Sequence, residues 1–192
     1  MSTFIGWGPD EFLCRRSHAI LAGGRVWITD ATDEPGIDER IRALGEPAAV
    51  VQLLDRHGRD CDAVAARLGV PHHVTPFGGV PDAPFEVRKI AHIPSWHELA
   101  LWFPAERVLV TADALGSVGY FRAPDEPFGV HPMLRLWPPK KALGSLEPAH
   151  LLFGHGEGYH RVDAPAQLRF ALNSARRRLP AALLSAVRRS AS

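Results

Sequence analysis

Residues 50–74, VVQLLDRHGRDCDAVAARLGVPHHV, contain the part of the chain that decides the fold. The apolar run over 49–54 has no polar alternation, which predicts a strand covered on both faces. Apolar residues at helical spacing over 60–69 predict a helix that ends at Gly69, and VPHHV predicts a further short strand. The polar connection over 55–61 therefore follows a buried strand directly, which is where α/β proteins often place reactive groups.

Outward from this stretch, short strands and helices alternate along the chain. Gly23-Gly24 predicts the turn of a hairpin over 17–31. The remaining expected elements are a helix over 36–45, strands over 85–93, 99–104 and 107–113, a short helix over 139–146, a strand over 150–156, a helix from Asp163 and another helical piece from Pro180. Paired strands with single crossovers predict an α/β protein with two mixed sheets and helices outside.

The composition is that of an ordinary globular domain. The chain has 192 residues, 46% hydrophobic residues and a formal net charge of +1, which does not point to nucleic acid. Two cysteines do not make a disulfide framework, and we find no secretion signal or membrane span, so a cytoplasmic protein is expected. We expect one domain over 1–192, a small-molecule substrate and no membrane or nucleic-acid partner; the oligomeric state stays open.

Polar residues that can bind metals follow several of the predicted strands. They are Asp55, His57 and Asp60 after AVVQLL, His92 and His97 in HIPSWHE, Asp113 after RVLVTA and His155 after HLLF. Carboxylates and imidazoles are the ligands that zinc and similar divalent ions prefer. If these strand ends converge, the sequence predicts a metal site there.

The order of these motifs resembles the metallo-β-lactamase superfamily over about residues 14–160. The segments LLDRHGRDC, HIPSWHELALWFP, ERVLVTADALGS and LLFGHGEGYH follow one another at plausible spacing, and GGRVWITDA matches the early strand that ends in the family's structural Asp, here Asp30. The resemblance implies a four-layer αββα sandwich of two mixed β-sheets with outer helices, the C-terminal ones at about 163–189. It also implies a metal centre at the strand ends.

The metal loop departs from the family's His-x-His-x-Asp-His pattern. In an ungapped reading, Asp55 replaces the first His, His57 keeps the second, Arg59 replaces the Asp and Asp60 replaces the last His. A guanidinium at the carboxylate position repels a second divalent ion, and it could pair with Asp60 or Asp113. A one-residue insertion would instead place Asp60 on the Asp position and Cys61 on the last His. His92 and His97 both remain candidates for the third histidine.

Three functions are compatible with these residues. The first is a metal-dependent hydrolase with one divalent ion, zinc first and iron or manganese as alternatives, which activates water to cleave an ester, thioester, lactone or phosphoester. Its predicted metal ligands are Asp55, His57, His97, Asp113 and His155, and its predicted catalytic residues are Asp55, His57, Asp60 and Asp113.

The second function is that of a metal-free pseudoenzyme, a binding or scaffold module in which Arg59 pairs with Asp55, Asp60 and Asp113 in place of metal. The third is a redox protein that uses iron, because Asp in place of His makes the loop richer in carboxylates. The irregular segment over 116–138 is expected to line the pocket in each case.

Overall fold

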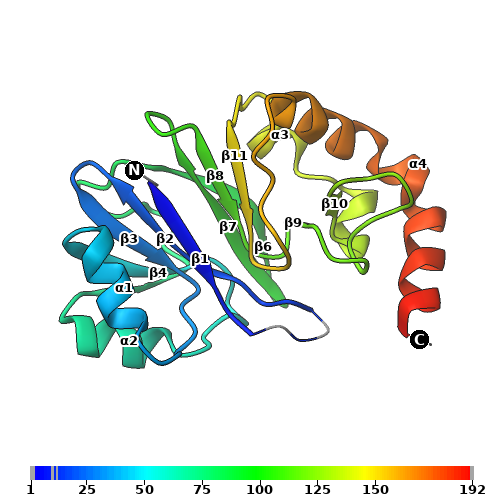
Figure 1. Cartoon of the computed structure of the whole chain (residues 1–192). Coiled ribbons are helices and arrows are strands. Elements are labelled where there is room, and N and C mark those ends of the chain that lie inside the picture. Colours follow the sequence, from blue (N-terminus) through cyan, green and yellow to red (C-terminus); the bar gives the residue numbers. More distant parts are fainter. Residues whose placement is uncertain (1–2, 10, 12, 191–192) are drawn as a thin grey trace.

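The computed structural model describes residues 3–9, 11 and 13–190, with side chains described as far as residue 185. Two β-sheets pack face to face, with helices on both outer faces, so four layers follow one another across the molecule (Figure 1). The predicted α/β sandwich of two mixed sheets with outer helices is confirmed.

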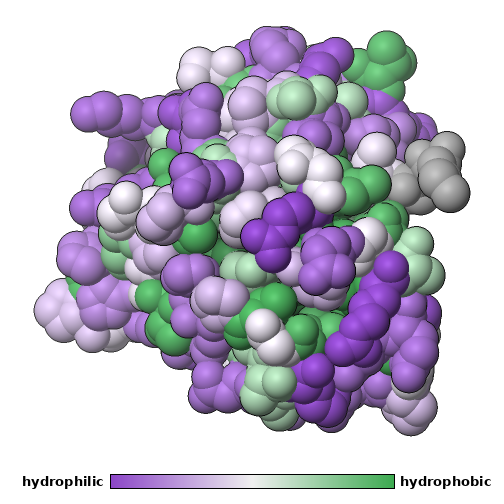
Figure 2. Space-filling model, turned by 90° about the vertical axis from the view of Figure 1, so that its left-hand side faces the viewer, coloured by the Kyte–Doolittle hydropathy of each residue, from purple (hydrophilic) through white to green (hydrophobic). Residues whose placement is uncertain are grey.

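The first sheet has the strand order β1-β2-β3-β4-β5 and is mixed. The pairs β1–β2 and β2–β3 are antiparallel, whereas β3–β4 and β4–β5 are parallel. Its strands are β1 Phe4–Trp7, β2 Ser17–Ala22, β3 Arg25–Thr29, β4 Pro47–Gln52 and β5 His72–Val74. Its outer face is covered by α1 Ile37–Leu44 and α2 Cys61–Leu68, and hydrophilic residues dominate that side of the molecule (Figure 2).

The second sheet has the strand order β11-β8-β7-β6, with β11–β8 parallel and the other pairs antiparallel. Its strands are β6 Glu86–Ile93, β7 Trp96–Phe103, β8 Val108–Thr111 and β11 His150–Phe153. The helices α3 Lys140–Leu143 and α4 Ala164–Ser190 cover its outer face (Figure 1). The expected irregular segment contains the short ribbon β9 Leu115–Gly116 and β10 Gly129–Val130, and the 3₁₀ helix η1 Pro132–Leu136.

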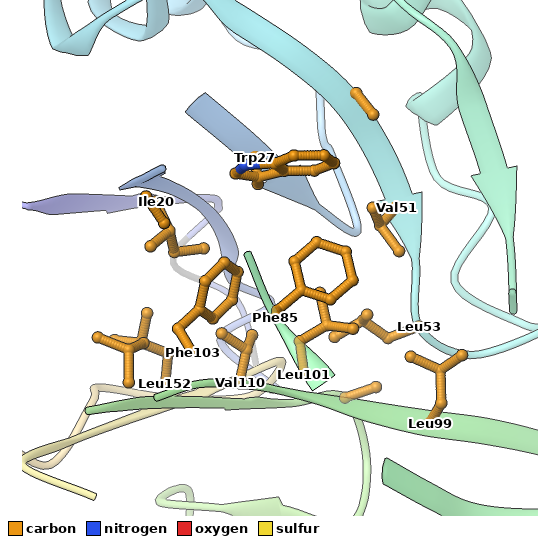
Figure 3. Packing of buried hydrophobic residues seen from close by; sticks show 14 of the residues in the cluster. Ile20, Trp27, Val51, Leu53, Phe85, Leu99, Leu101, Phe103, Val110 and Leu152 are labelled. Carbon is orange, nitrogen blue, oxygen red and sulfur yellow. The ribbon is translucent and has the colours of Figure 1, made fainter. Parts of the chain in front are cut away.

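The inner faces of the two sheets share one hydrophobic core. Trp27 meets Phe85 edge-on, and Phe85 meets Phe103 in the same way, between the layers. Figure 3 shows these rings surrounded by aliphatic side chains from both sheets, namely Ile20, Val51, Leu53, Leu99, Leu101, Val110 and Leu152. Because this core fixes the two sheets relative to each other, it also fixes the loops at their common edge.

The structure corrects one prediction about the C-terminus. A separate helical piece was expected from Pro180, but α4 continues through Pro180 as one helix. Proline removes one backbone hydrogen bond inside a helix, and the flanking Ala- and Leu-rich turns are strong helix formers that continue it here. In the described part of the chain, no helix, α4 included, is long and apolar enough to cross a membrane.

Candidate metal centre

Three loops that follow strands meet at one edge of the sandwich. His57 lies after β4, Asp113 follows β8 and His155 follows β11. Their ligand atoms all lie within 4.8 Å of one another. His57 Nε2 lies 3.2 Å from Asp113 Oδ1, and His155 Nε2 lies 3.1 Å from the same oxygen. We call these residues the His57–Asp113–His155 trio.

The other ring nitrogen of each histidine is held by an acceptor. His57 Nδ1 lies 2.8 Å from Asp30 Oδ2, and His155 Nδ1 lies 2.9 Å from the carbonyl oxygen of Leu13. A carboxylate and a carbonyl can only accept, so both Nδ1 atoms must donate. In the neutral tautomers, both Nε2 lone pairs then point toward Asp113.

Asp30 is itself fixed by the backbone around it. It directly follows β3 with φ +45°, and its Oδ1 accepts a hydrogen bond of 2.7 Å from the N–H of Leu53. A carboxylate that orients a ligand histidine is a common feature of metal sites in proteins. The sequence pointed to Asp30 as a structural residue, and the structure shows which imidazole it orients.

The residues of the trio fit one divalent ion. Asp113 Oδ1 is buried, and it has no partner of hydrogen-bond geometry among the described residues although two imidazole nitrogens lie beside it. Ligand atoms at about 2.0–2.1 Å from a tetrahedral zinc ion stand about 3.3 Å apart. The two nitrogen–oxygen distances of the trio are close to that value. Two imidazoles and one carboxylate also match the donors that zinc, iron and manganese accept.

The charges of the trio are strongly coupled. Burial by itself would raise the pKa of the Asp113 carboxyl, but His155 and His57 beside it hold that pKa well below its usual range. Burial would lower the pKa of His57, but Asp30 and Asp113 outweigh it and raise the pKa to about 9. In the absence of a metal ion, a proton on His57 therefore supplies positive charge beside Asp113.

The other predicted site residues lie outside the trio. Asp55 Oδ2 accepts from the backbone N–H of His97 at 3.1 Å and lies 3.2 Å from Nδ1 of the same histidine. His92 is exposed, with its ring centroid 4.8 Å from that of His97. The structure thus joins Asp55 and His97 to each other, and it brings neither His92 nor His97 into the trio.

Asp60 and Cys61 face away from the trio as well. Asp60 is exposed and its Oδ2 accepts a 2.8 Å bond from the N–H of Asp33. Cys61 is the first residue of α2 and is buried, and burial raises the pKa of its thiol to about 12. A metal-binding thiolate is therefore costly to form at Cys61. The geometry gives no support to the alignment with a one-residue insertion, which would place Cys61 at the position of the last His.

Arg59 does not make the ion network expected of the metal-free alternative. Its Nη1 donates to the carbonyl oxygens of Arg16 at 2.8 Å and Asp30 at 3.0 Å, and its Nη2 donates to that of Gly154 at 3.3 Å. In the described residues, no ion pair joins it to Asp55, Asp60 or Asp113. Instead, its guanidinium donates to these three backbone carbonyl oxygens, which lie next to the ends of β2, β3 and β11. Its Nη2 also lies 3.4 Å from His57 Nδ1, so the cation stands beside the trio.

Sequence reasoning missed a buried acid next to the trio. Glu98 on β7 is fully buried and accepts hydrogen bonds from Trp96 Nε1 at 2.7 Å and from the N–H of Ala114 at 2.6 Å. Burial and the nearby charge of Asp113 raise the pKa of Glu98 to about 8. One signal was available: Glu98 interrupts an apolar strand, where an unpaired charge is rarely tolerated.

Comparisons with known proteins identify the fold. No family model and no curated protein sequence matches the chain. Among solved structures, TTHA1623 in a di-iron-bound form is 21% identical, with a TM-score of 0.56 over 83% of this chain and 96% of that chain. The BLEG-1 B3 metallo-beta-lactamase is 15% identical, with a TM-score of 0.55 over 81% and 93%.

A peroxy diiron species of the chemotaxis sensor ODP is 15% identical, with a TM-score of 0.51 over 90% of each chain. The shared architecture makes this chain a metallo-β-lactamase-fold protein, as the resemblance of its motifs implied. At these identities the likeness establishes the fold alone.

Proposed function

We propose that the chain is a metal-dependent hydrolase-like protein of the metallo-β-lactamase fold, with one divalent ion held by His57, Asp113 and His155. One observation carries the proposal: two imidazole Nε2 atoms and a buried carboxylate oxygen converge, with both Nδ1 atoms already donating elsewhere. The di-iron and metallo-β-lactamase structures of the same fold are consistent with it. Zinc is the first candidate, and iron or manganese suits the same donors.

The chemistry that such an ion supplies when bound is the acidification of a water molecule, which provides a nucleophile near neutral pH. The residues of this chain perform the other tasks. Asp30 and the Leu13 carbonyl hold the two imidazoles in the tautomer that presents Nε2. Asp113 supplies negative charge at the same point, and an ester, thioester, lactone or phosphoester would enter from the pocket that has Asp113 and His155 in its wall.

Arg59 favours one ion rather than two. Its guanidinium lies beside His57 and is bonded to three carbonyl oxygens around the site. A fixed positive charge there raises the cost of a second cation nearby. The carboxylates Asp55 and Asp60, which could have supported a second ion, are engaged with His97 and with the Asp33 N–H.

The test is elemental analysis of untagged protein purified without chelator, followed by titration with zinc, iron(II) and manganese. About one ion per chain is expected, and Asp113→Asn and His155→Gln should each reduce the content below about 0.2. Asp60→Asn is the matched control, since it changes an acid outside the trio and should leave the content unchanged. Wild-type protein that contains no stoichiometric ion and takes up none would contradict the proposal.

The metal-free binding module remains the second candidate, and the observation that favours it is the fixed positive charge of Arg59 beside His57, although Arg59 bonds carbonyl oxygens and not the expected carboxylates. If Arg59 only replaces a cation structurally, its bonds to three carbonyls matter for stability, and Arg59→Ala should cost about 1–3 kcal/mol because carbonyls are left unpaired. Arg42→Ala is the control, because Arg42 donates to one exposed carbonyl. Loss of stability in Arg59→Ala together with absence of metal from the wild type would favour the module over the hydrolase.

A further inference from the structure

A pocket of about 560 Å³ opens beside the trio, with Asp113 and His155 in its wall. Apolar and aromatic side chains make up most of the remaining lining, namely Leu13, Trp96, Tyr120, Phe121, His131 and Met133. Pockets of this size with a few polar groups are typical sites for small molecules.

The rings around the pocket support one another. Phe121 stacks on His155 with ring centroids 5.6 Å apart, and Trp96 meets His131 edge-on at 4.9 Å. Burial lowers the pKa of His131 to about 4, so this ring is neutral near pH 7. The pocket therefore offers a rigid apolar wall for a flat or aliphatic group.

Arg56 places a positive charge at one end of this apolar wall. Its guanidinium carbon lies 4.8 Å from the centre of the Trp96 ring, and its Nη1 donates to the carbonyl oxygen of Ser95 at 2.8 Å. These contacts fix the plane of the guanidinium while 47% of the side chain stays exposed. Of the described residues that line the pocket, Arg56 is the one with a permanent positive charge.

The orientation of Arg56 suits an oxyanion. A guanidinium carries five N–H donors in a planar fork that matches a carboxylate, and the contacts described above use only its Nη atoms. Nη2 donates to Asp113 Oδ2 at 3.5 Å, and Nη1 lies 3.9 Å from Asp55 Oδ1, so a bound anion would compete with two long ion pairs for this guanidinium. An anion bound by Arg56 would therefore lie only a few ångströms from the trio.

We propose that Arg56, stacked on Trp96, is the specificity-determining residue of this pocket, and that the pocket takes an apolar or aromatic molecule carrying a carboxylate close to its hydrolysable group. The pocket's apolar wall receives the body of the molecule, and Arg56 receives the carboxylate. Hydrolysis of the bound molecule rests on the proposed function, because it needs the metal ion. Binding of the carboxylate by Arg56 needs no ion.

The experiment compares 4-phenylbutyrate with its neutral amide, 4-phenylbutyramide, on the full chain as purified and after chelation. Binding is measured by calorimetry and by tryptophan fluorescence, because Trp96 lies in the pocket. Wild-type protein should bind the acid at least about tenfold more tightly than the amide, as expected for a charge-assisted bond. Arg56→Gln should abolish that preference, and Arg56→Lys should keep part of it.

Arg161→Gln is the matched control, because Arg161 also lies over an aromatic ring, Tyr159 at 6.0 Å, but outside the pocket. It should bind the acid like the wild type. Equal binding of acid and amide by the wild type, or an undiminished preference in Arg56→Gln, would overturn the assignment. Tighter binding of benzylphosphonate than of phenylbutyrate would overturn the choice of a carboxylate.

Metal content measured on the same samples separates this inference from the proposed function. A preference for the acid that depends on Arg56, in protein that contains no metal as purified and takes up none on titration, would support the pocket and contradict the hydrolase. A stoichiometric ion together with an Arg56→Gln variant that still prefers the acid would contradict the pocket alone.

Discussion

At the scale of single residues, Asp30 determines which nitrogen of His57 faces the trio. In Asp30→Asn, the amide can keep an oxygen on the Leu53 N–H, but it then presents an N–H group toward His57 Nδ1. The imidazole would shift to the tautomer with hydrogen on Nε2, which cannot bind an ion. We expect the metal affinity to fall about 10–100-fold, measured by competition with a chromogenic chelator.

Asparagine tolerates the positive φ of residue 30, so this variant should fold. Asp33→Asn is the control, since Asp33 is an exposed acid that pairs with Arg67 instead. An Asp30→Asn protein with wild-type affinity would show that His57 is not oriented through Asp30.

His18 makes the fold sensitive to acid. It is only 4% exposed, and burial lowers its pKa from 6.5 to about 4 in the folded chain, while its Nε2 lies 2.8 Å from the carbonyl oxygen of Phe153. The unfolded chain takes up the proton as the pH falls through 6.5, and the folded chain takes it up only near 4. His18 should therefore reduce the free energy of unfolding by about 3 kcal/mol between pH 6.5 and 4, with no effect above pH 7.

Urea denaturation of His18→Gln at a series of pH values checks this expectation. The free energy of unfolding should fall less steeply between pH 6.5 and 4 than in the wild type, whatever its level at pH 7. His73→Gln, which changes a partly exposed histidine on β5, should keep the wild-type slope. Identical slopes for His18→Gln and the wild type would rule out His18 as the acid-sensitive group.

Residue types and their positions after strands placed His57, Asp113 and His155 among the predicted ligands, and the structure brings these three side chains together. The same pattern could not separate Asp55 and His97 from the trio, because their pairing depends on how β4 and β7 approach each other. The bridge between Leu54 and Glu98 sets that approach, and it joins residues 44 positions apart in the chain. Spacing along a sequence cannot report such a contact.

At the scale of elements, a buried ion pair holds the segment over 116–138 against α4. Arg135 is fully buried and pairs with Glu126 at 2.6 Å, while Arg178 on α4 donates to the same carboxylate at 2.9 Å. Arg135 also donates to the carbonyl oxygen of Phe121, the ring that stacks on His155. This pair therefore shapes the wall of the pocket as well as the loop.

Arg135→Met leaves Glu126 with Arg178 as its remaining cation, and it removes the donor to the buried carbonyl oxygens of Phe121 and Val130. It should therefore reduce the free energy of unfolding by about 1–3 kcal/mol. The double variant Arg135→Met/Glu126→Leu should recover part of that loss. Arg169→Gln, which breaks an exposed pair with Glu147, should cost about 1 kcal/mol or less. Thermal unfolding measures all three, and equal shifts for Arg135→Met and Arg169→Gln would contradict a buried network.

The alternation and capping signals predicted most elements, and the exceptions have physical causes. Strand β1 was not predicted, because FIGW is short and is stabilised by pairing with β2, as in Phe4 opposite Ile20. The continuity of α4 through Pro180 was also missed. In both cases, contacts or neighbouring turns outweighed the local preference of a few residues.

At the scale of the whole molecule, the trio spans the two sheets. His57 follows a strand of the first sheet, whereas Asp113 and His155 follow strands of the second. The hydrophobic core fixes most of the interface (Figure 3), but the edge at the trio brings together charged and polar groups. An ion bound there would link the two sheets directly, at the edge where the apolar core ends.

This placement predicts that metal stabilises the fold as a whole. An ion that binds the folded chain alone adds about 2.7 kcal/mol at about 100 times its Kd, which raises the Tm of a chain of this length by several degrees. Amide exchange should slow in both loops, after β4 and after β11, because one ion holds both. Asp113→Asn should show neither effect, and Asp60→Asn should show both. Protection confined to one loop would mean that the ion does not bridge the sheets, even if it binds.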